Sequence, residues 1–243
     1  KLNRSFHGAG IPILEGYGLT ETSPVIAVNS FERVKIGTVG HVLDNLDVKI
    51  QADGEITVKG PSVFQGYYKD DEKTKEAFTE DGYFMTGDIG HIDEEGFLHI
   101  TDRKKEMFKT SGGKYVAPQV LENLAKGSKF IEQIMVVGDG EKMPCALVQP
   151  DYAFAKLWAE RKHLKIGKTP EEMANSPELK ARIMKDINLL NATLGKWEQI
   201  KKIELTPTLW TIEDGLLTPT MKLKRKAVKE KFFNLYEKLY DRA

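Results

Sequence analysis

The feature that most constrains the fold is a series of short apolar runs that flank glycine-containing turns. Asp53-Gly54 separates the first two runs, and a Glu-Glu-Gly turn ending at Gly96 separates the second two. Such turns between two strand-like runs are typical of β-hairpins, because glycine tolerates the positive φ of a tight turn. We therefore predict a small, mostly antiparallel β-barrel or sandwich over residues 29–102. The runs cover residues 48–50, 55–59, 90–92 and 97–100.

Residues 11–14 (IPIL) are predicted to form a buried strand that leads into a loop with two glycines at 15–21. A single strand cannot form a sheet by itself. We therefore expect its partners to lie upstream of Lys1, as at the end of a larger α/β domain.

The second half of the chain mixes helix and strand signals. A helix is predicted to begin at Pro118 and to stop at Gly127, because proline fits a first helical turn and glycine ends a helix. Strand-like runs at 134–137 and 145–148 flank a Gly-Asp-Gly turn. A charged run near 102–105, which has no apolar face, marks the expected boundary between two domains.

Two more helices are predicted towards the C-terminus. Thr169 and Glu172 form a capping box with Pro170 at the first helical position. Apolar residues then recur at helical spacing at positions 179, 183, 187, 190 and 194. Residues 223–239 place apolar side chains on roughly one side of a lysine-rich helix.

These signals predict an α+β fold class. Residues 1–102 are expected to be the end of an α/β domain with a small antiparallel β-barrel-like subdomain. Residues 103–243 are expected to be a hinged α+β domain with a core of its own.

Composition excludes several classes of protein. The 243 residues carry 36 basic and 36 acidic side chains, so no global charge recruits nucleic acid. The single cysteine, Cys145, excludes an internal disulfide framework and fits a reducing, cytoplasmic location. The five histidines are not at metal-binding spacing. We see no signal peptide and no apolar stretch of the roughly 20 residues that a membrane span needs.

Two segments carry side chains suited to nucleotide chemistry. In residues 16–21 (GYGLTE), Tyr17 suits contact with a base, Thr20 suits donation to phosphate and Glu21 suits Mg²⁺. Asp88, after the glycine of TGD, suits two hydroxyl hydrogen bonds from a ribose. Taken alone, each segment is equally consistent with an ordinary turn.

Two lysine-containing segments are ambiguous by themselves. Gly112-Gly113-Lys114 suggests a phosphate-binding Walker loop, but that loop requires glycine at Phe108 and serine or threonine at Tyr115. A basic run is usually a solvated loop. By residue type alone, Lys222 is one more cation near an exposed helix.

In this order and spacing, the motifs resemble those of adenylate-forming enzymes, which include acyl- and aryl-CoA synthetases, beetle luciferases and peptide-synthetase adenylation domains. The resemblance covers essentially the whole chain. Within the family it is most similar to long-chain fatty acyl-CoA synthetases, although Met221 replaces the glycine that many relatives carry before the lysine. The matching segments are YGLTE at 17–21, GEITVKGP at 54–61, GYY at 66–68, TGD at 86–88, DRKK at 102–105, Gly112, VAP at 116–118, and PT at 219–220 with Lys222.

The resemblance implies a two-step ligase. A carboxylic acid reacts with Mg²⁺-ATP to give acyl-adenylate and pyrophosphate, and coenzyme A then displaces AMP. Glu15, Gly16, Tyr17 and Gly18 would line the nucleotide site, and Thr20 would bind the α-phosphate. The implied roles of the other residues are Glu21 for Mg²⁺, Asp88 and Arg103 for the ribose, and Lys222 for the substrate carboxylate and phosphate.

The resemblance also implies a rotation of the C-terminal domain between the two steps. The hinge maps to Lys105, and the surface presented to coenzyme A carries Lys109, Ser111 and Gly112. The family's Ser/Thr/Gly-rich loop for the outer phosphates does not occur in this sequence, so we expect the chain alone to be inactive.

Several alternatives stay open from the sequence. The acid could be aromatic or of medium length, and the chain could be a module that binds AMP or coenzyme A without catalysis. An amphipathic membrane anchor at 223–240 is disfavoured by its few apolar positions, although peripheral membrane contact stays open. Acyl length and oligomeric state are not encoded in any motif that we find.

Overall fold

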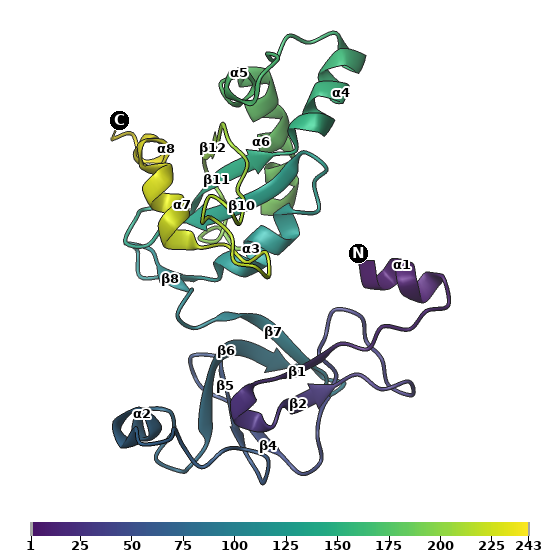
Figure 1. Cartoon of the computed structure of the whole chain (residues 1–243), viewed down its shortest axis with the longest axis vertical. Helices are drawn as coiled ribbons and strands as arrows, with labels where there is room; N and C mark the ends of the chain where they lie inside the picture. Colours follow the sequence, from purple (N-terminus) through teal and green to yellow (C-terminus); the bar gives the residue numbers. More distant parts are fainter. Residues whose placement is uncertain (1, 243) are drawn as a thin grey trace. The chain divides into compact units, whose positions relative to one another are not determined.

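The computed structural model describes residues 2–242. The chain forms two compact units, which we call unit 1 (Lys1–Lys105) and unit 2 (Glu106–Ala243). Figure 1 shows both with their helices and strands labelled. Unit 1 is mostly antiparallel strands, whereas unit 2 mixes helices and strands. The predicted α+β class is thus confirmed.

Unit 1 contains two antiparallel sheets. Its helical segments are α1 (Leu2–Gly8), the 3₁₀ helix η1 (Thr20–Thr22) and α2 (Asp71–Glu76). The first sheet has the order β1 (Gly16–Gly18), β2 (Val25–Val28), β3 (His41–Val42). The second has the order β4 (Asp47–Ile50), β5 (Glu55–Lys59), β6 (Phe84–Ile92), β7 (Leu98–Arg103).

Both predicted hairpins of unit 1 are confirmed. β4 pairs with β5 across Asp53-Gly54, and β6 pairs with β7 across the turn that contains Gly96. Gly54 and Gly96 have φ of +85° and +84°, the conformation for which glycine is suited. These elements were predictable because the turn and both strands are adjacent in sequence.

The predicted buried strand at residues 11–14 is wrong. These residues form no regular element, and Ile11 is 53% exposed. Pro12 has no N–H to donate to a sheet, and the backbone N–H of Ile13 instead donates to the His7 ring at 3.3 Å. The strand of this region is β1, and its partner is β2, which lies downstream in the same chain.

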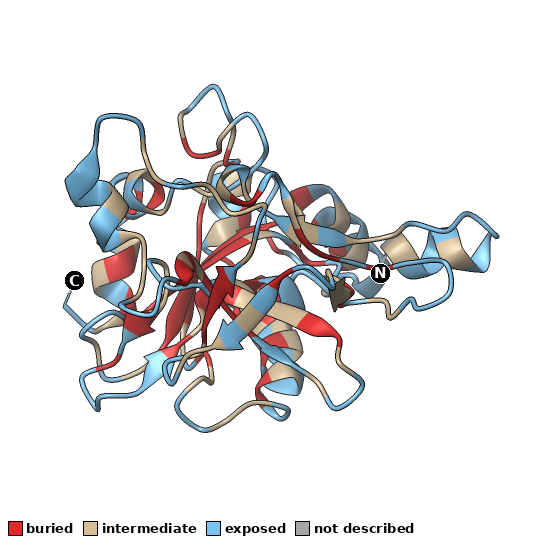
Figure 2. Cartoon of the chain, turned by 90° about the horizontal axis from the view of Figure 1, so that it is seen from below, coloured by how far each residue is buried: buried red, intermediate tan, exposed pale blue. Residues whose placement is uncertain are grey.

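The two sheets of unit 1 share a continuous core. Ala27 of β2 is buried with Ile56 of β5 and Leu98 of β7. The backbone also joins the sheets, since the Val39 N–H donates to Leu98 O at 2.9 Å and the Leu98 N–H donates to Gly40 O at 2.8 Å. Figure 2 shows that buried residues lie along the strands. This packing holds β1, β6 and β7 in fixed relation to one another.

Unit 2 is built on a three-stranded sheet with helices on both faces. β10 (Ile131–Val137) pairs antiparallel with β11 (Cys145–Pro150), as predicted, and β12 (Ile203–Leu205) adds a parallel edge. A separate two-stranded ribbon joins β8 (Phe108–Lys109) to β9 (Tyr115–Val116). The helices are α3 (Pro118–Ala125), α4 (Tyr152–Lys162), α5 (Pro170–Ala174), α6 (Pro177–Asn191), α7 (Arg225–Lys231) and α8 (Phe233–Leu239).

Alternation along β10 explains the layers of unit 2. Ile134 and Val136 belong to the core formed with α3, α4 and α6, whereas Met135 and Val137 belong to the core formed with Trp210, α7 and α8. Successive side chains of a strand point to opposite faces, so both faces of this sheet are covered.

The helix predictions for unit 2 are confirmed with two corrections, the first being that the helical pattern at 169–194 forms two helices, α5 and α6. α3 begins at Pro118, and the capping box of Thr169 and Glu172 opens α5. The predicted C-terminal helix is two helices, because the backbone breaks at Phe232 with φ −110° and ψ 32°. The Phe232 side chain is buried, with its ring centroid 6.2 Å from that of Trp210.

Candidate active site

A buried carboxylate, Asp88, is contacted from two other strands, one in each sheet of unit 1. Asp88 lies on β6 with its residue only 4% exposed. The Tyr17 hydroxyl on β1 donates to its Oδ2 at 2.7 Å, and Arg103 Nε on β7 lies 3.0 Å from its Oδ1. The structure therefore brings together three of the predicted site residues.

The Asp88 carboxylate has acceptor positions that its two protein partners do not use. An ionised carboxylate offers about four acceptor positions, and Tyr17 and Arg103 use two of them. Burial raises the pKa of the Tyr17 hydroxyl well above its usual range, so this group stays protonated and donates throughout the physiological pH range. Two acceptor positions are left, which is the number that the vicinal hydroxyls of a ribose require.

The turn before Asp88 is fixed by side chains that the sequence analysis did not single out. The Gly87 N–H donates to Glu55 Oε1 at 3.0 Å, and the Asp88 N–H donates to Thr86 Oγ1 at 3.1 Å. The Thr86 hydroxyl in turn donates to Ile56 O at 2.7 Å. Glu55 and Thr86 lie within two of the segments that resemble the adenylate-forming enzymes, at 54–61 and 86–88. Membership of these segments is the one sequence signal that marks them as important.

Glu15 is held through its backbone. Its carbonyl oxygen accepts from the Asn29 N–H at 2.9 Å and from Asn29 Nδ2 at 3.2 Å. The Gly37 N–H donates to the Glu15 carboxylate at 3.4 Å. The loop 29–40 therefore determines where Glu15 lies.

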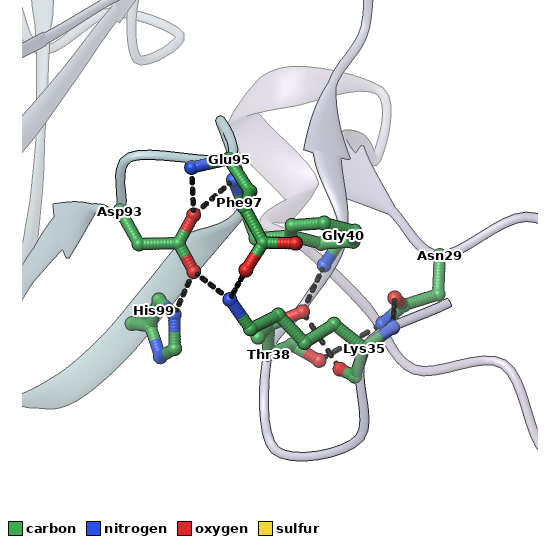
Figure 3. A network of polar contacts seen from close by, with 8 residues as sticks. All are labelled: Asn29, Lys35, Thr38, Gly40, Asp93, Glu95, Phe97 and His99. Atoms are coloured by element: carbon green, nitrogen blue, oxygen red, sulfur yellow. Dashed lines mark hydrogen bonds and ion pairs between the residues drawn. The ribbon is translucent and has the colours of Figure 1, made fainter. Parts of the chain in front are cut away.

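That loop is tied to the β6–β7 turn by the polar network drawn in Figure 3. Lys35 Nζ lies 2.7 Å from Asp93 and 2.5 Å from Glu95, and His99 Nε2 lies 2.9 Å from Asp93. The hydrogen bond from Lys35 holds the pKa of the Asp93 carboxyl well below its usual range. The network keeps loop 29–40, and with it Glu15, in place.

The two glycines beside Tyr17 have structural reasons to be glycine. A Cβ on Gly18 would lie 1.6 Å from the Pro24 carbonyl oxygen, which no side chain tolerates. A Cβ on Gly16 would lie 3.3 Å from Ala27 O, a close contact within the β1–β2 pair. Gly18 is therefore required by the turn itself.

Thr20 and Glu21 lie on η1. Thr20 is exposed, and Glu21 is half-buried with its Oε1 accepting from the Tyr67 hydroxyl at 3.1 Å. Within residues 2–242, no group of three or more His, Cys, Asp or Glu side chains is placed to hold a metal ion. Mg²⁺ is commonly held by one or two carboxylates together with phosphates and water. Glu21 fits that arrangement, since Tyr67 occupies one of its acceptor positions and leaves others open.

In unit 2, Lys109 ends β8, and Ser111 and Gly112 lie on the exposed turn of the β8–β9 ribbon. The Ser111 N–H donates to Glu141 O at 2.8 Å, which anchors the turn. A Cβ on Gly112 would meet nothing closer than Thr110 Oγ1 at 3.9 Å, and the positive φ of the turn falls on Gly113. Neither space nor backbone conformation within the chain requires glycine at position 112.

Lys222 ends a tight loop ahead of α7. The Thr218 N–H donates to Lys222 O at 2.8 Å, and the Lys222 N–H donates to Thr218 Oγ1 at 3.0 Å. Met221 adopts φ +61°, the left-handed conformation in which glycine is favoured. Lys222 itself is exposed.

A separate hollow of about 540 Å³ lies in unit 2, between α3, α6 and the segment 127–131. Its lining is mostly apolar and includes Phe130 and Leu190. None of the predicted site residues lines it, so it is not part of the candidate active site.

Comparisons with known proteins agree with these features. The family model described as AMP-binding enzyme matches residues 1–68, and the AMP-binding enzyme C-terminal domain matches residues 106–243. A long-chain-fatty-acid–CoA ligase of Mycobacterium bovis is 43% identical over 242 residues, which cover 100% of this chain and 40% of the relative. Long-chain-fatty-acid–CoA ligase 6 of Rattus norvegicus is 38% identical over 245 residues, which cover 95% of this chain and 35% of the relative.

A solved structure shows the same fold. The adenylation domain of a carboxylate reductase from Mycobacterium chelonae matches with a TM-score of 0.74 and 25% sequence identity, over 99% of this chain and 36% of that one. The chain spans about two fifths of the length of the curated relatives named above. Because the C-terminal-domain model matches all of unit 2 and the AMP-binding model matches much of unit 1, the chain belongs to the AMP-binding, adenylate-forming enzymes.

Proposed function

We propose that this chain is the C-terminal part of a ligase that activates a long-chain fatty acid with Mg²⁺-ATP and transfers the acyl group to coenzyme A. The observation that carries the nucleotide assignment is the Tyr17–Asp88–Arg103 arrangement, a buried carboxylate with two acceptor positions open. The acid is suggested by the names of the relatives in Mycobacterium bovis and Rattus norvegicus.

In the first step, a carboxylate oxygen attacks the α-phosphorus of ATP and the bond to pyrophosphate breaks. Asp88 and Arg103 bind the ribose, and Thr20 donates to the α-phosphate. Mg²⁺, held by Glu21 and the phosphates, neutralises charge when it is bound. Lys222 supplies a positive charge where the two anions meet, and such stabilisation is usually the largest single contribution to catalysis.

A second group of residues is proposed to bind the adenine base. Glu15, Gly16 and Tyr17 line its pocket, and Gly18 belongs to the same nucleotide site. The backbone bonds of Glu15 to loop 29–40 and the close approach of Gly18 to Pro24 support it, because they hold this strand in one conformation.

In the second step, the thiol of coenzyme A attacks the acyl carbonyl carbon and AMP leaves. Unit 2 turns at Lys105 between the steps, so that the face with Lys109, Ser111 and Gly112 replaces Lys222. Gly112 supports this assignment, because nothing within the chain explains its lack of a side chain. A pantetheine arm lying against the backbone would explain it.

The test is ATP–pyrophosphate exchange by the full-length enzyme against a panel of acids. We expect exchange to be fastest with acids of long chain length, and coenzyme A to convert the adenylate to a thioester. Faster exchange with aromatic or medium-chain acids would assign a different substrate. No exchange with any acid would leave a nucleotide-binding module without catalysis.

A second experiment uses the 243-residue chain alone. We expect it to make no acyl-CoA from ATP, oleate and coenzyme A, because its sequence has no Ser/Thr/Gly-rich loop for the outer phosphates. Thioester formation by the purified chain would contradict this.

A further inference from the structure

The residue before Lys105 is anchored in unit 1 by its side chain and its backbone. Lys104 Nζ lies 2.6 Å from Glu55 Oε2 and 2.8 Å from Asp53 Oδ2. The Lys104 N–H donates to Gly87 O at 2.8 Å, which continues the β6–β7 pairing by one residue. The hydrogen bonds that Lys104 donates to Asp53 and Glu55 raise its pKa, as expected for a cation with two carboxylate partners.

Glu55 joins this anchor to the candidate nucleotide site. Its side chain is only 5% exposed, and its second oxygen accepts from the Gly87 N–H at 3.0 Å. One buried carboxylate therefore holds both Gly87, which precedes Asp88, and Lys104, which precedes Lys105. A buried charge needs such partners to be tolerated.

The residue after Lys105 is anchored in unit 2. Glu106 accepts from Gln119 Nε2 at 2.5 Å and lies 3.5 Å from Arg225 Nε. Arg225 also reaches α3, where its Nη2 lies 2.6 Å from Glu122 Oε1, and it donates to Val136 O at 3.2 Å. The Glu122 side chain is 8% exposed, so this second anchor is also a buried carboxylate.

Arg225 joins this second anchor to the Lys222 loop. It is the first residue of α7 and follows Lys222 by three positions. Its contacts to Glu106 and Glu122 therefore hold the end of the Lys222 loop against the first residue of unit 2. Lys105 itself is exposed, and within residues 2–242 its side chain makes no hydrogen bond or ion pair.

We propose that Glu55 and Glu122, acting through Lys104 and Arg225, are positioning residues that confine the rotation of unit 2 to Lys105. This inference rests on the proposed function, in which unit 2 takes two orientations. Because both neighbours of Lys105 are anchored, the change in backbone torsion between the two orientations of unit 2 is confined to Lys105. Each orientation of unit 2 is therefore well defined. Losing an anchor spreads the change over several residues, and small misplacements of reacting groups are costly.

The first experiment tests the anchors without any chemistry. Amide hydrogen exchange of the 243-residue chain is followed by NMR, residue by residue. We expect the amide at position 104 to exchange at least about 10-fold more slowly than that at position 105. Lys104→Met should speed exchange at position 104 by about 10-fold, the effect of losing a charged hydrogen bond. Equal exchange at 104 and 105 in the wild type would overturn the inference and leave the proposed function untouched.

The second experiment measures both half-reactions in the full-length enzyme. Lys104→Met and Arg225→Met should each lower the rate constants of adenylation and thioester formation by about 10-fold or more. The KM for ATP should stay within about two-fold, because the Gly87 bond to Glu55 and the contacts of Asp88 persist. A change in the KM for ATP with unchanged rate constants would contradict a positioning role.

Matched controls separate positioning from stability. Lys180 Nζ lies 2.7 Å from buried Glu204, and Arg242 Nη2 lies 2.7 Å from Glu141. Lys180→Met and Arg242→Met remove comparable ion pairs and should leave both half-reactions within about two-fold of wild type. If they slow the enzyme as much as Lys104→Met and Arg225→Met, the effect is general destabilisation and the inference fails.

A double variant covers the case in which Lys104→Met does not fold. Lys104→Met with Glu55→Gln removes the unpaired buried charge but keeps an acceptor for the Gly87 N–H. We expect it to fold and to remain slow in both half-reactions. Recovery of wild-type rates would show that the Glu55–Lys104 pair does not position unit 2.

Discussion

The Asp88 turn of unit 1 and the Lys222 loop of unit 2 each carry a charge proposed to act on the nucleotide, and they are built differently. Asp88 is buried, and its two carboxylate oxygens have partners on β1 and β7. Lys222 is exposed, and the bonds that hold it come from its own backbone to Thr218. Among residues 2–242, its ammonium group has no hydrogen bond or ion pair.

The difference matches what the two steps would require. A ribose must stay bound while both reactions occur, so its acceptor is preorganised and its position does not depend on unit 2. A charge needed in one step must approach and then withdraw, and a side chain without local partners does so at little cost. The comparison predicts that variants in the turn and in the loop affect the enzyme in different ways.

Lys222→Ala in the full-length enzyme should have the largest effect. Loss of a charge that acts on the transition state typically costs about 10²-fold or more, and we expect that loss in adenylation. Thioester formation from added acyl-adenylate should be unchanged, since Lys222 is proposed to have withdrawn by then. Pyrophosphate release and thioester formation measure the two steps.

The control for Lys222→Ala is Lys226→Ala, which removes a well-exposed lysine of α7. It should leave both steps unchanged. If Lys222→Ala slowed both half-reactions equally, Lys222 would have a structural role. The proposed difference between a charge used in one step and the permanently placed Asp88 would then be lost.

Lys105→Pro should have the next largest effect. Proline fixes φ near about −65° and removes an N–H, so rotation about φ at this residue is blocked. We expect adenylation close to wild type and thioester formation reduced by about 10-fold or more, because the Gly112 turn is not presented to the thiol. Lys105→Ala, which keeps the backbone free, should retain both steps.

One outcome would count against the hinge at Lys105, and another would bear only on the adenylating orientation. A folded Lys105→Pro enzyme with wild-type thioester rates would place the hinge elsewhere, with Asp102 and Lys104 the next candidates. Loss of both half-reactions together would contradict the expectation that the adenylating orientation tolerates the fixed φ.

Tyr17→Phe, which alters a contact of the Asp88 turn, should have a smaller effect than the two lysine variants. It keeps the ring but removes the 2.7 Å hydrogen bond to Asp88. A bond to a charged group contributes about 1.5–3 kcal/mol, and Arg103 still pairs with the carboxylate. We therefore expect the KM for ATP to rise about five-fold with little change in the rate constants. The control is Tyr68→Phe, at a tyrosine that is 88% exposed; an unchanged KM for Tyr17→Phe would mean that the hydroxyl does not orient Asp88.

Local signals in the sequence predicted local structure well. The hairpin across Asp53-Gly54 and the capping box at Thr169 involve residues that are neighbours along the chain, so propensity and turn chemistry suffice. The apolar run at residues 11–14 favours a strand, but these residues form none, because Pro12 has no N–H to donate to a sheet. β12 went unpredicted, because its parallel pairing with β11 depends on distant sequence.

For the candidate site, too, the sequence predicted local features but not contacts between distant residues. Tyr17, Asp88 and Arg103 could be named from motifs, and the structure brings them together. Glu55, Thr86 and Tyr67, which hold the turn and Glu21, could not be named. All three lie within matching motifs, but the motifs do not indicate their roles, which depend on which strands pair and which side chains then meet.

Met221→Gly should have the smallest effect. It tests the Lys222 loop without removing the charge of Lys222. Met221 has φ +61°, a conformation that costs a residue with a side chain about 1 kcal/mol. The side chain is 57% exposed, so its removal sacrifices few contacts. Glycine relieves the strain but gains freedom in the unfolded chain, which offsets part of the benefit.

We therefore expect Met221→Gly to raise the free energy of unfolding of unit 2 by about 0.5–1 kcal/mol, or its Tm by roughly 2–4 °C. Calorimetry of the 243-residue chain measures this. Met221→Ala, which keeps the strained φ, should give no gain. Adenylation by the full-length Met221→Gly enzyme should match wild type, because both backbone bonds between Thr218 and Lys222 remain. A lower Tm for Met221→Gly would mean that the methionine side chain stabilises the loop through its contacts, and that Lys222 is held by more than the backbone of its turn.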